Sequence, residues 1–267
     1  MNCHSLPLFR SGGSSPKTTV PSSRRHVQPP SPSDVNFALA ESVNLRNSRP
    51  VRLCPTPPSR GLEPVTKPKL FGISGSRAIR AIWGMEETGI DYEHVPVTYG
   101  ADSKGADYLA VNPNGRIPAL IDGDLQLFES MAINLYLAKR YGGALYPSSD
   151  EDEARTWQGS VWGISEIEPL QMQIVIQKLF TPEDKRNPKV VEHATKNLQR
   201  PLKVLDTALE GRDWLVGSAF SVADLNVASV MHLMGMIRFD YSEHANVQRW
   251  TDACYARPAL ARALAKP

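Results

Sequence analysis

Three short stretches of this sequence carry side chains whose types and spacing can do chemistry. Ser74 and Ser76 lie in "ISGSRAIRA", and Pro118 interrupts the apolar run of "GRIPAL". Glu129 and Ser130 end the stretch "LFES". Groups at the start of a helix can bind an anion, and a neighbouring carboxylate can pair with an ammonium group. Glu129 and Ser130 therefore suit a ligand with an amino acid end, although alone they are better explained as a surface glutamate beside an N-capping serine.

Pro118 lies where the sequence otherwise predicts a strand. Proline has no N–H group to donate to a neighbouring strand, and its ring fixes φ, so it confines a strand to the edge of a sheet. A rigid turn without a ligand is the ordinary explanation for a single proline. The apolar run on both sides of Pro118 indicates that the residue is there for another reason.

The elements that must position these residues are predicted by hydrophobic periodicity. Strands are expected at "KLFGIS" and "DYEHVPVTY", with a helix over residues 76–89 between them. Asp122-Gly123 joins two short apolar runs and predicts a hairpin. A helix follows from Ser130 and ends before Gly142, a residue type common after helix ends. The predicted order is strand, helix, strand, an irregular segment, two strands and a helix.

The second half of the chain is predicted to be helical. Helices are expected over about residues 151–180, 188–210, 221–237 and 245–265. The third begins with "FSVAD", in which Ser221 has the position of an N-cap and Asp224 the third helical position, as in a capping box. We therefore assign Ser221 and Asp224 a structural role, although Asp224 is a carboxylate in an apolar setting.

Together these motifs resemble the cytosolic glutathione transferases. The resemblance covers about residues 69–265 and depends on "NPNGRIPAL" followed by "LFES", on "FGISGSRAIRAIW", on "VGSAFSVADLNVA" and on "RWTDACYARPALARAL", in this order. It implies an α/β plus all-α fold: a thioredoxin-like domain of order βαβ-α-ββα over residues 67–147, then an all-helical bundle over 148–267. The family is commonly a homodimer.

The resemblance also implies how glutathione is held. In this fold the proline at the Pro118 position follows a cis peptide bond, which exposes the main chain of Ile117 to the cysteinyl backbone of glutathione. Glu129 and Ser130 occupy the positions that grip the γ-glutamyl end. Arg116 has the position of a residue near the glycyl carboxylate, where a solvated loop arginine is nearly as good an explanation.

The same resemblance places the catalytic residue, a tyrosine, serine or cysteine that hydrogen-bonds the sulfur, at the start of the first helix. Ser76 is favoured because serine-type relatives often carry an arginine four residues later, as Arg80 is here, where we expect it to be structural. Ser74 remains the alternative. The absence of cysteine from "ISGSRAIRA" argues against thiol–disulfide chemistry through a mixed disulfide.

The expected function is conjugation of the glutathione thiolate to electrophilic, largely apolar small molecules. Trp162 and Met172 are candidates for the wall that binds this second substrate. The alternative function is a non-catalytic binding or regulatory module of the same fold, and a glutathione-dependent isomerase or dehalogenase also remains open. Glutathione is expected as a co-substrate without a metal ion, because His232 and Cys254 have no partners at metal-ligand spacing.

Composition separates residues 1–68 from the rest of the chain. This segment holds 12 of the 22 prolines and nine basic against three acidic residues, so the remainder carries 21 basic and 25 acidic residues. The mild acidity of the remainder argues against a nucleic acid partner. No membrane partner is expected, because the most apolar long stretch, residues 220–239, contains too many polar residues to cross a bilayer.

Residues 1–66 are expected to be a disordered leader. A transit peptide, a plain tail and a reading frame extended upstream of a start at Val65 are three open interpretations of it. The expected location is the cytoplasm, or a chloroplast or mitochondrion if the leader is a transit peptide. Only Cys254 lies beyond the leader, so no disulfide is expected, which fits a reducing compartment.

Overall fold

The structure, a computed structural model, describes residues 67–267, so the expectations for residues 1–66 lie outside the described residues. Its first half contains β1 (Lys69–Phe71), α1 (Ile79–Thr88), β2 (Glu93–Val95), α2 (Ala101–Lys104), α3 (Ala106–Leu109), β3 (Ala119–Asp122), β4 (Leu125–Phe128) and α4 (Ser130–Tyr141). The predicted thioredoxin-like order is confirmed. The segment predicted to be irregular contains two short helices, α2 and α3.

The four strands form one mixed sheet in the order β2-β1-β3-β4. β1 pairs in parallel with β2, and the crossover between them is α1, because parallel strands cannot be joined by a tight turn. β3 runs antiparallel to both β1 and β4. The predicted hairpin is present: Asp122 pairs with Leu125, and Gly123 takes a φ of +59°, which glycine adopts without a steric penalty.

The second half is helical, as predicted. It contains η1 (Gly143–Leu145), α5 (Asp150–Trp162), η2 (Gly163–Ile167), α6 (Glu168–Val175), η3 (Ile176–Phe180), η4 (Glu183–Lys185), α7 (Pro188–Ala208), α8 (Val222–Met236), α9 (Ala245–Tyr255) and α10 (Pro258–Leu264). η2 and η3 are π-helical turns that continue α5 and α6, so residues 150–180 form one long interrupted helix. The first π-helical turn ends just before Pro169, which lacks the N–H group that a regular helix needs.

The single helix predicted over residues 245–265 is wrong, because the structure divides it into α9 and α10. The break falls at Arg257 and Pro258: Arg257 has an extended backbone, and Pro258 begins α10. Proline has no N–H group to donate within a helix and disfavours the helical conformation of the residue before it. The break lets α10 turn back onto α1.

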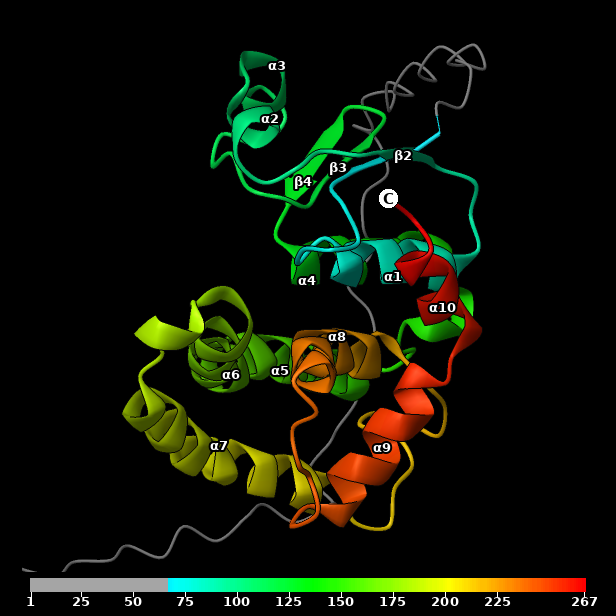
Figure 1. Ribbon diagram of the computed structural model, residues 1–267. Helices are drawn as coiled ribbons and strands as arrows, with labels where there is room; N and C mark the ends of the chain where they lie inside the picture. The colour runs from blue at the N-terminus through cyan, green and yellow to red at the C-terminus, as the bar shows by residue number, and fades with distance from the viewer. Residues whose placement is uncertain (1–66) are drawn as a thin grey trace, which may run out of the picture. The chain divides into compact units, whose positions relative to one another are not determined.

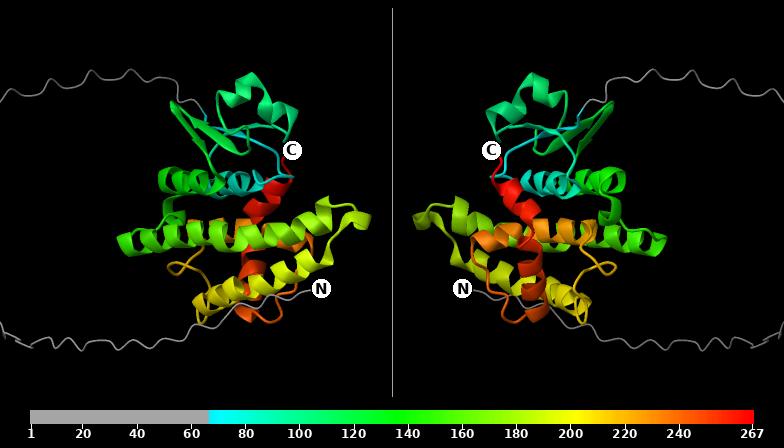
Figure 2. Two further views of the ribbon diagram at one scale, coloured as in Figure 1. Left: turned by 90° about the vertical axis from the view of Figure 1, so that its left-hand side faces the viewer. Right: turned by 90° about the vertical axis from the view of Figure 1, so that its right-hand side faces the viewer.

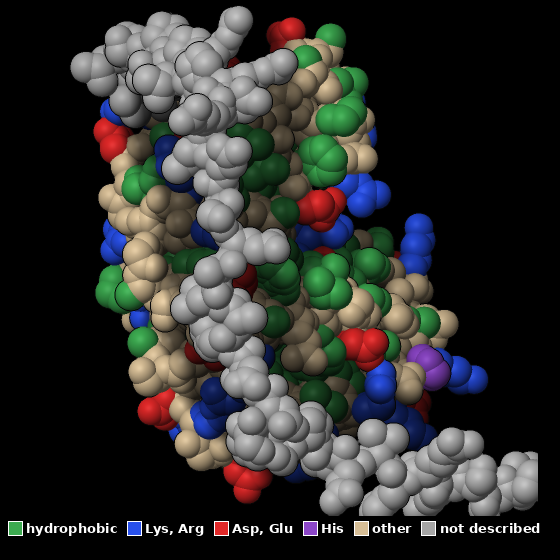
Figure 3. Space-filling view, turned by 180° about the vertical axis from the view of Figure 1, so that it is seen from behind, with side chains coloured by type: hydrophobic (Ala, Val, Ile, Leu, Met, Phe, Trp, Pro, Cys, Tyr) green, Lys and Arg blue, Asp and Glu red, His purple; other side chains and the backbone are tan. Residues whose placement is uncertain are grey.

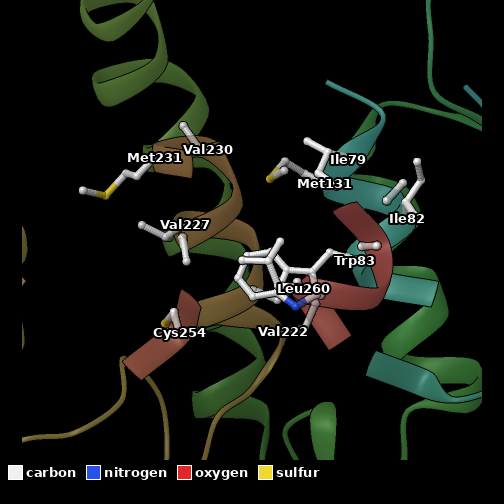
Figure 4. Close-up of a cluster of buried hydrophobic side chains, with 14 of the residues drawn as sticks. Ile79, Ile82, Trp83, Met131, Val222, Val227, Val230, Met231, Cys254 and Leu260 are labelled. Atoms are coloured by element: carbon white, nitrogen blue, oxygen red, sulfur yellow. The ribbon is translucent and has the colours of Figure 1, made fainter. Parts of the chain in front are cut away.

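Helix α1 lies at the centre of residues 67–267. Figures 1 and 2 show α1 and α4 beneath the sheet, with α5, α6 and α8 in the next layer and α7 and α9 beyond. Trp83 of α1, Leu260 of α10 and Val222 of α8 meet in the buried cluster of Figure 4. Gly84 permits the close packing of α1 against α4, since a Cβ atom there would lie 2.3 Å from Asn134 Oδ1. The core therefore joins the sheet layer to the helical layer through α1.

One face of the described residues is mixed in character. Figure 3 shows hydrophobic, acidic and basic side chains interspersed on the face behind that of Figure 1. Within residues 67–267 no helix combines the length and apolar character that crossing a membrane requires.

Asp224 connects the N-terminus of α8 to two other segments, the loop before α8 and helix α9. Its carboxylate accepts hydrogen bonds from the N–H groups of Leu215 (2.8 Å) and Ser221 (3.0 Å), from the Ser221 hydroxyl (3.1 Å) and from Trp250 Nε1 (2.9 Å). Burial raises the pKa of Asp224, and these hydrogen bonds oppose the rise. The geometry is the predicted capping box, extended to the loop before α8 and to α9.

We expect Asp224→Ala to lower the free energy of unfolding by about 3 kcal/mol or more. Three buried N–H donors would lose their acceptor, and an unsatisfied buried donor costs about 1–3 kcal/mol. Ser221→Ala is the matched control, because it loses the cap alone and should cost only about 1 kcal/mol. Denaturant unfolding of both variants measures the difference. Equal losses would show that Asp224 is no more than a helix cap.

Candidate functional site

A cavity of about 540 Å³ opens between the sheet layer and the helical layer. It brings together most of the residues that the sequence singled out. Its lining includes Ser76, Arg80, Arg116, Ile117, Pro118, Glu129, Ser130 and Met172. These residues come from four separate segments, so only the folded chain places them side by side.

Ser76 faces this cavity from the turn before α1, whereas Ser74 does not line it. The Ser76 hydroxyl donates to the Ile73 carbonyl (2.8 Å) and accepts from the Ala78 N–H (3.0 Å). The Ser74 hydroxyl instead donates to the main-chain carbonyl of Lys266 (2.8 Å), near the C-terminal end. The two serines that the sequence left as alternatives thus have different surroundings.

The loop before β3 presents the main chain of Ile117 to the cavity. The Ile117–Pro118 peptide bond is cis, and within residues 67–267 neither the N–H nor the C=O of Ile117 has a hydrogen-bond partner. The preceding carbonyl, of Arg116, is held by the Tyr108 hydroxyl (2.7 Å) and Asn112 Nδ2 (2.6 Å). Burial raises the pKa of Tyr108 to about 12, so this hydroxyl stays protonated as a donor. The Arg116 side chain is exposed.

Glu129 and Ser130 form the junction between β4 and α4. Glu129 has a φ of 73° and a ψ of 110°, a conformation that non-glycine residues rarely adopt and that costs about 1–3 kcal/mol. Ser130 is the first residue of α4 rather than its N-cap, so the N-capping explanation is wrong. Ser130 as a residue is 7% exposed, it lines the cavity, and its hydroxyl has no hydrogen-bond partner among the described residues. An unpaired hydroxyl that opens on a cavity at a helix N-terminus suits an anionic ligand.

A buried ion pair forms one wall of the cavity. Arg80 of α1 binds Glu168 of α6 through two hydrogen bonds, with Nη1–Oε2 at 3.0 Å and Nη2–Oε1 at 3.1 Å. Arg77 also approaches Glu168, at 3.3 Å. Through these contacts Arg80 links α1 to α6, and the structural role that the sequence predicts for it stays a prediction. The sequence did not single out Glu168, since only the fold brings a carboxylate 88 residues away to Arg80.

Part of the cavity lining is apolar. Met172 lies there with Ile164, Leu233, Phe180 and Tyr99. Trp162, the other candidate for the second substrate, instead lines a separate cavity of about 480 Å³ between α5, α7 and α8. The spacing of Ile164, Glu168 and Met172 explains the difference, because residues four apart share one helix face and Trp162 lies on another.

Tyr99 and Phe180 were not found from the sequence. Both are strongly exposed aromatic residues, Tyr99 in the loop after β2 and Phe180 at the end of η3. Neither belongs to a periodic pattern or a motif that marks a site. Their exposure beside a cavity is the signal, and it is visible only in the structure.

His232 and Cys254 have the surroundings of structural residues. Burial, and secondarily the charge of Arg80, lowers the pKa of His232. Burial raises the pKa of the Cys254 thiol far above its usual range, so the thiol is not a nucleophile. Within residues 67–267 no cluster of three His, Cys, Asp or Glu side chains is placed to hold a metal ion.

The chain is similar to known proteins over both halves. Residues 67–139 match the family model described as glutathione S-transferase, N-terminal domain, and residues 167–258 match that of the C-terminal domain. Glutathione S-transferase 3 of Zea mays is 34% identical over 219 residues, which cover 74% of this chain and 93% of the maize protein.

Solved structures agree with this similarity. The theta class glutathione S-transferase of Xanthomonas axonopodis pv. citri, with glutathione bound, has a TM-score of 0.70 and 29% identity over 76% of this chain and 99% of its own. The yeast protein Ure2p, in complex with glutathione, has a TM-score of 0.67 and 25% identity over 76% of this chain and 96% of its own. The matched domains, the identity to the maize enzyme and the shared fold lead to one conclusion: the chain belongs to the glutathione S-transferase family.

Proposed function

We propose that the protein is a serine-type glutathione transferase, which joins the glutathione thiolate to electrophilic, largely apolar small molecules. One observation carries the proposal. Ser76, the unpaired peptide groups of Ile117, Glu129 and the unpaired hydroxyl of Ser130 all line one cavity. A non-catalytic protein of the same fold would not need these four groups in one cavity.

Each part of glutathione has a complementary group. The α-carboxylate of the γ-glutamyl residue binds at Ser130, where the hydroxyl and the first N–H groups of α4 are available, and its ammonium group pairs with Glu129. The cysteinyl main chain pairs with the N–H and C=O of Ile117, as an added strand would. Arg116 lies at the mouth for the glycyl carboxylate. This arrangement places the cysteinyl sulfur near Ser76.

Ser76 then acts on the sulfur. Its hydroxyl hydrogen rotates from the Ile73 carbonyl to the sulfur, while the Ala78 N–H continues to donate to Ser76 Oγ and makes the hydroxyl a better donor. The Ile73 carbonyl keeps the Ser76 N–H, at 3.2 Å, as a partner. The hydrogen bond favours the thiolate, so the thiol proton leaves to solvent. The thiolate attacks the electrophilic carbon, and any leaving group departs with its electron pair.

The electrophile binds against the apolar part of the lining of the same cavity. Met172, Ile164 and Leu233 give it an apolar wall, and methionine adapts to ligands of different shape. The reaction consumes reduced glutathione, so we place the protein in a reducing compartment. The cytoplasm is the simplest, with a chloroplast or mitochondrion as the alternative that residues 1–66 would have to direct.

We also propose a homodimer, because α5 and η2 carry an exposed apolar stripe. Trp157 is 50% exposed and Val161 is 68% exposed, and Ile164 continues them at helical spacing. Phe128 of β4 adds another exposed aromatic side chain. Exposure of such an apolar stripe to water is energetically unfavourable. A second copy of the chain would cover the stripe in a two-fold interface.

Replacing the sulfur-binding hydroxyl tests the proposed reaction. In Ser76→Ala, loss of a hydrogen bond to a charged acceptor, about 1.5–3 kcal/mol, should raise the pKa of bound glutathione by about one to two units. Conjugation near pH 7 should slow roughly 10–100-fold, with a deficit that shrinks as pH rises. Ultraviolet titration of the bound thiolate measures the shift, and Ser218→Ala, an exposed serine outside the cavity, is the control. Superimposable titration curves for Ser76→Ala and the parent protein would eliminate this role.

The pairing of Glu129 with the ammonium group is tested by changing both partners. Glu129→Gln removes the charge but keeps the shape, and should weaken glutathione binding roughly 10–100-fold, since a charged hydrogen bond is worth about 1.5–3 kcal/mol. A glutathione analogue without the α-amino group should bind the parent protein weakly and the variant no more weakly. Calorimetry of the four combinations, with Glu151→Gln as the surface control, measures the coupling. Additive losses would contradict the pairing.

The dimer is tested by placing a charge in the apolar stripe. Val161→Asp should give a monomer, because burying an unpaired carboxylate in an interface is strongly unfavourable. Val204→Asp, at another exposed valine, on α7 and 53% exposed, should remain a dimer. Light scattering at micromolar concentrations measures the mass. A monomeric parent protein would refute the proposed interface.

A further inference from the structure

The peptide group that joins Ile73 to Ser74 is held on both of its sides. Its N–H donates to the main-chain oxygen of Pro267 at 2.8 Å. Its C=O accepts the Ser76 N–H at 3.2 Å and the Ser76 hydroxyl at 2.8 Å. A peptide group is planar, with its N–H and C=O pointing in opposite directions. The bond to Pro267 therefore fixes the orientation of the carbonyl that positions Ser76.

A second bond connects the same loop to the C-terminal segment. The Ser74 hydroxyl donates to the main-chain carbonyl of Lys266 at 2.8 Å, across 192 residues of sequence. Two bonds to consecutive carbonyls fix the position of Ser74 as well as its direction. Figures 1 and 2 show the C-terminal end beside the segment between β1 and α1.

The C-terminal segment is itself anchored. Ala259, Leu260 and Ala263 of α10 are buried, and α10 packs along α1. Arg262 binds Glu86 of α1 through Nε–Oε2 at 2.9 Å and through Nη2 to the main-chain oxygen at 2.7 Å. Helix α1 thus carries the C-terminal segment, which in turn holds the loop that begins α1.

We propose that Ser74 is a positioning residue, through which residues 266 and 267 hold the Ser76 hydroxyl in place for the sulfur of glutathione. The inference rests on the proposed role of Ser76. Gly75 lies between the two serines, is exposed and would have no contact within 4 Å even with a Cβ atom, so packing at Gly75 itself does not confine the loop. Without the two hydrogen bonds from Ser74 to residues 266 and 267, the peptide group before Ser74 can turn and move the Ser76 hydroxyl away from the cavity.

Removing the two acceptors tests the proposal most directly. A chain that ends at Ala265 keeps α10 but loses both carbonyls. Its profile of kcat/KM against pH, with a chlorodinitrobenzene as the electrophile, should shift to higher pH by about one unit, with an approximately tenfold loss near pH 7 that is recovered at high pH. Ser74→Ala should shift the profile in the same direction by less. Ser74→Thr should restore it, because threonine keeps the hydroxyl.

Two comparisons separate positioning from general stability. Lys266→Ala keeps the main-chain carbonyl and removes only partly exposed side-chain contacts, with Glu86 at 3.4 Å and with the Tyr92 ring at 5.2 Å, so its profile should match that of the parent protein. In a Ser76→Ala background the truncation should cause no further loss, because its effect passes through the missing hydroxyl. An equal loss in both backgrounds, or an unchanged profile in the truncated chain, would overturn the proposal.

Hydrogen exchange without any substrate keeps this inference distinct from the proposed function. The amides of residues 74–78 should exchange faster in the truncated chain and at the parent rate in Lys266→Ala. Unchanged exchange would contradict the proposal that residues 266 and 267 hold this loop, even if the parent protein is an active transferase. Faster exchange in a parent protein that neither binds glutathione nor conjugates the electrophile would refute the proposed function and, with it, the positioning role of Ser74.

Discussion

The ion pair between Arg80 and Glu168 is the constraint on which the rest of the site depends. Both side chains are largely buried, at 2% and 10% exposure, and they meet through two hydrogen bonds. Removing either partner from such a pair typically costs about 3–5 kcal/mol, because the other charge is left buried and unpaired. The pair fixes α6 against α1, and so fixes one wall of the cavity that Ser76 also lines. Specific geometry, more than net stability, is what the pair contributes here.

A second set of polar contacts continues this constraint through the layers of helices. Asn134 of α4 donates to the Arg80 carbonyl (3.1 Å) and to Asn226 Oδ1 (2.9 Å), and Asn226 donates to the Ser160 hydroxyl (2.9 Å). These buried groups join α1, α4, α8 and α5 in one register. Apolar packing alone would tolerate small slides between helices, whereas paired amides do not. The helices that support the loops of Ser76, Ile117 and Glu129 therefore have little freedom to shift against one another.

The predictions from sequence succeeded where a local pattern has one physical meaning. The Asp122-Gly123 turn and the Ser221 and Asp224 capping box are both present. The cis bond before Pro118 is also present, but the family resemblance implied it, not a local pattern. The predictions failed where the outcome depends on distant contacts. Trp162, which was predicted to line the same wall as Met172, lies on a different helix face and lines another cavity. The predicted final helix overlooked Pro258, a local signal that was available in the sequence.

The sequence by itself determined the elements, their order and the family, because periodicity, turn residues and motif spacing are properties of neighbouring residues. The tertiary structure alone decided which of two nearby serines faces the cavity. Ser74 and Ser76 differ little in local chemistry, yet Ser74 binds carbonyls 192 and 193 residues away, and Ser76 is left to open on the cavity. The same holds for Glu168 and Phe180, whose roles come from long-range packing. Contacts between segments far apart in the chain leave no periodic signal, since each segment alone fits many environments.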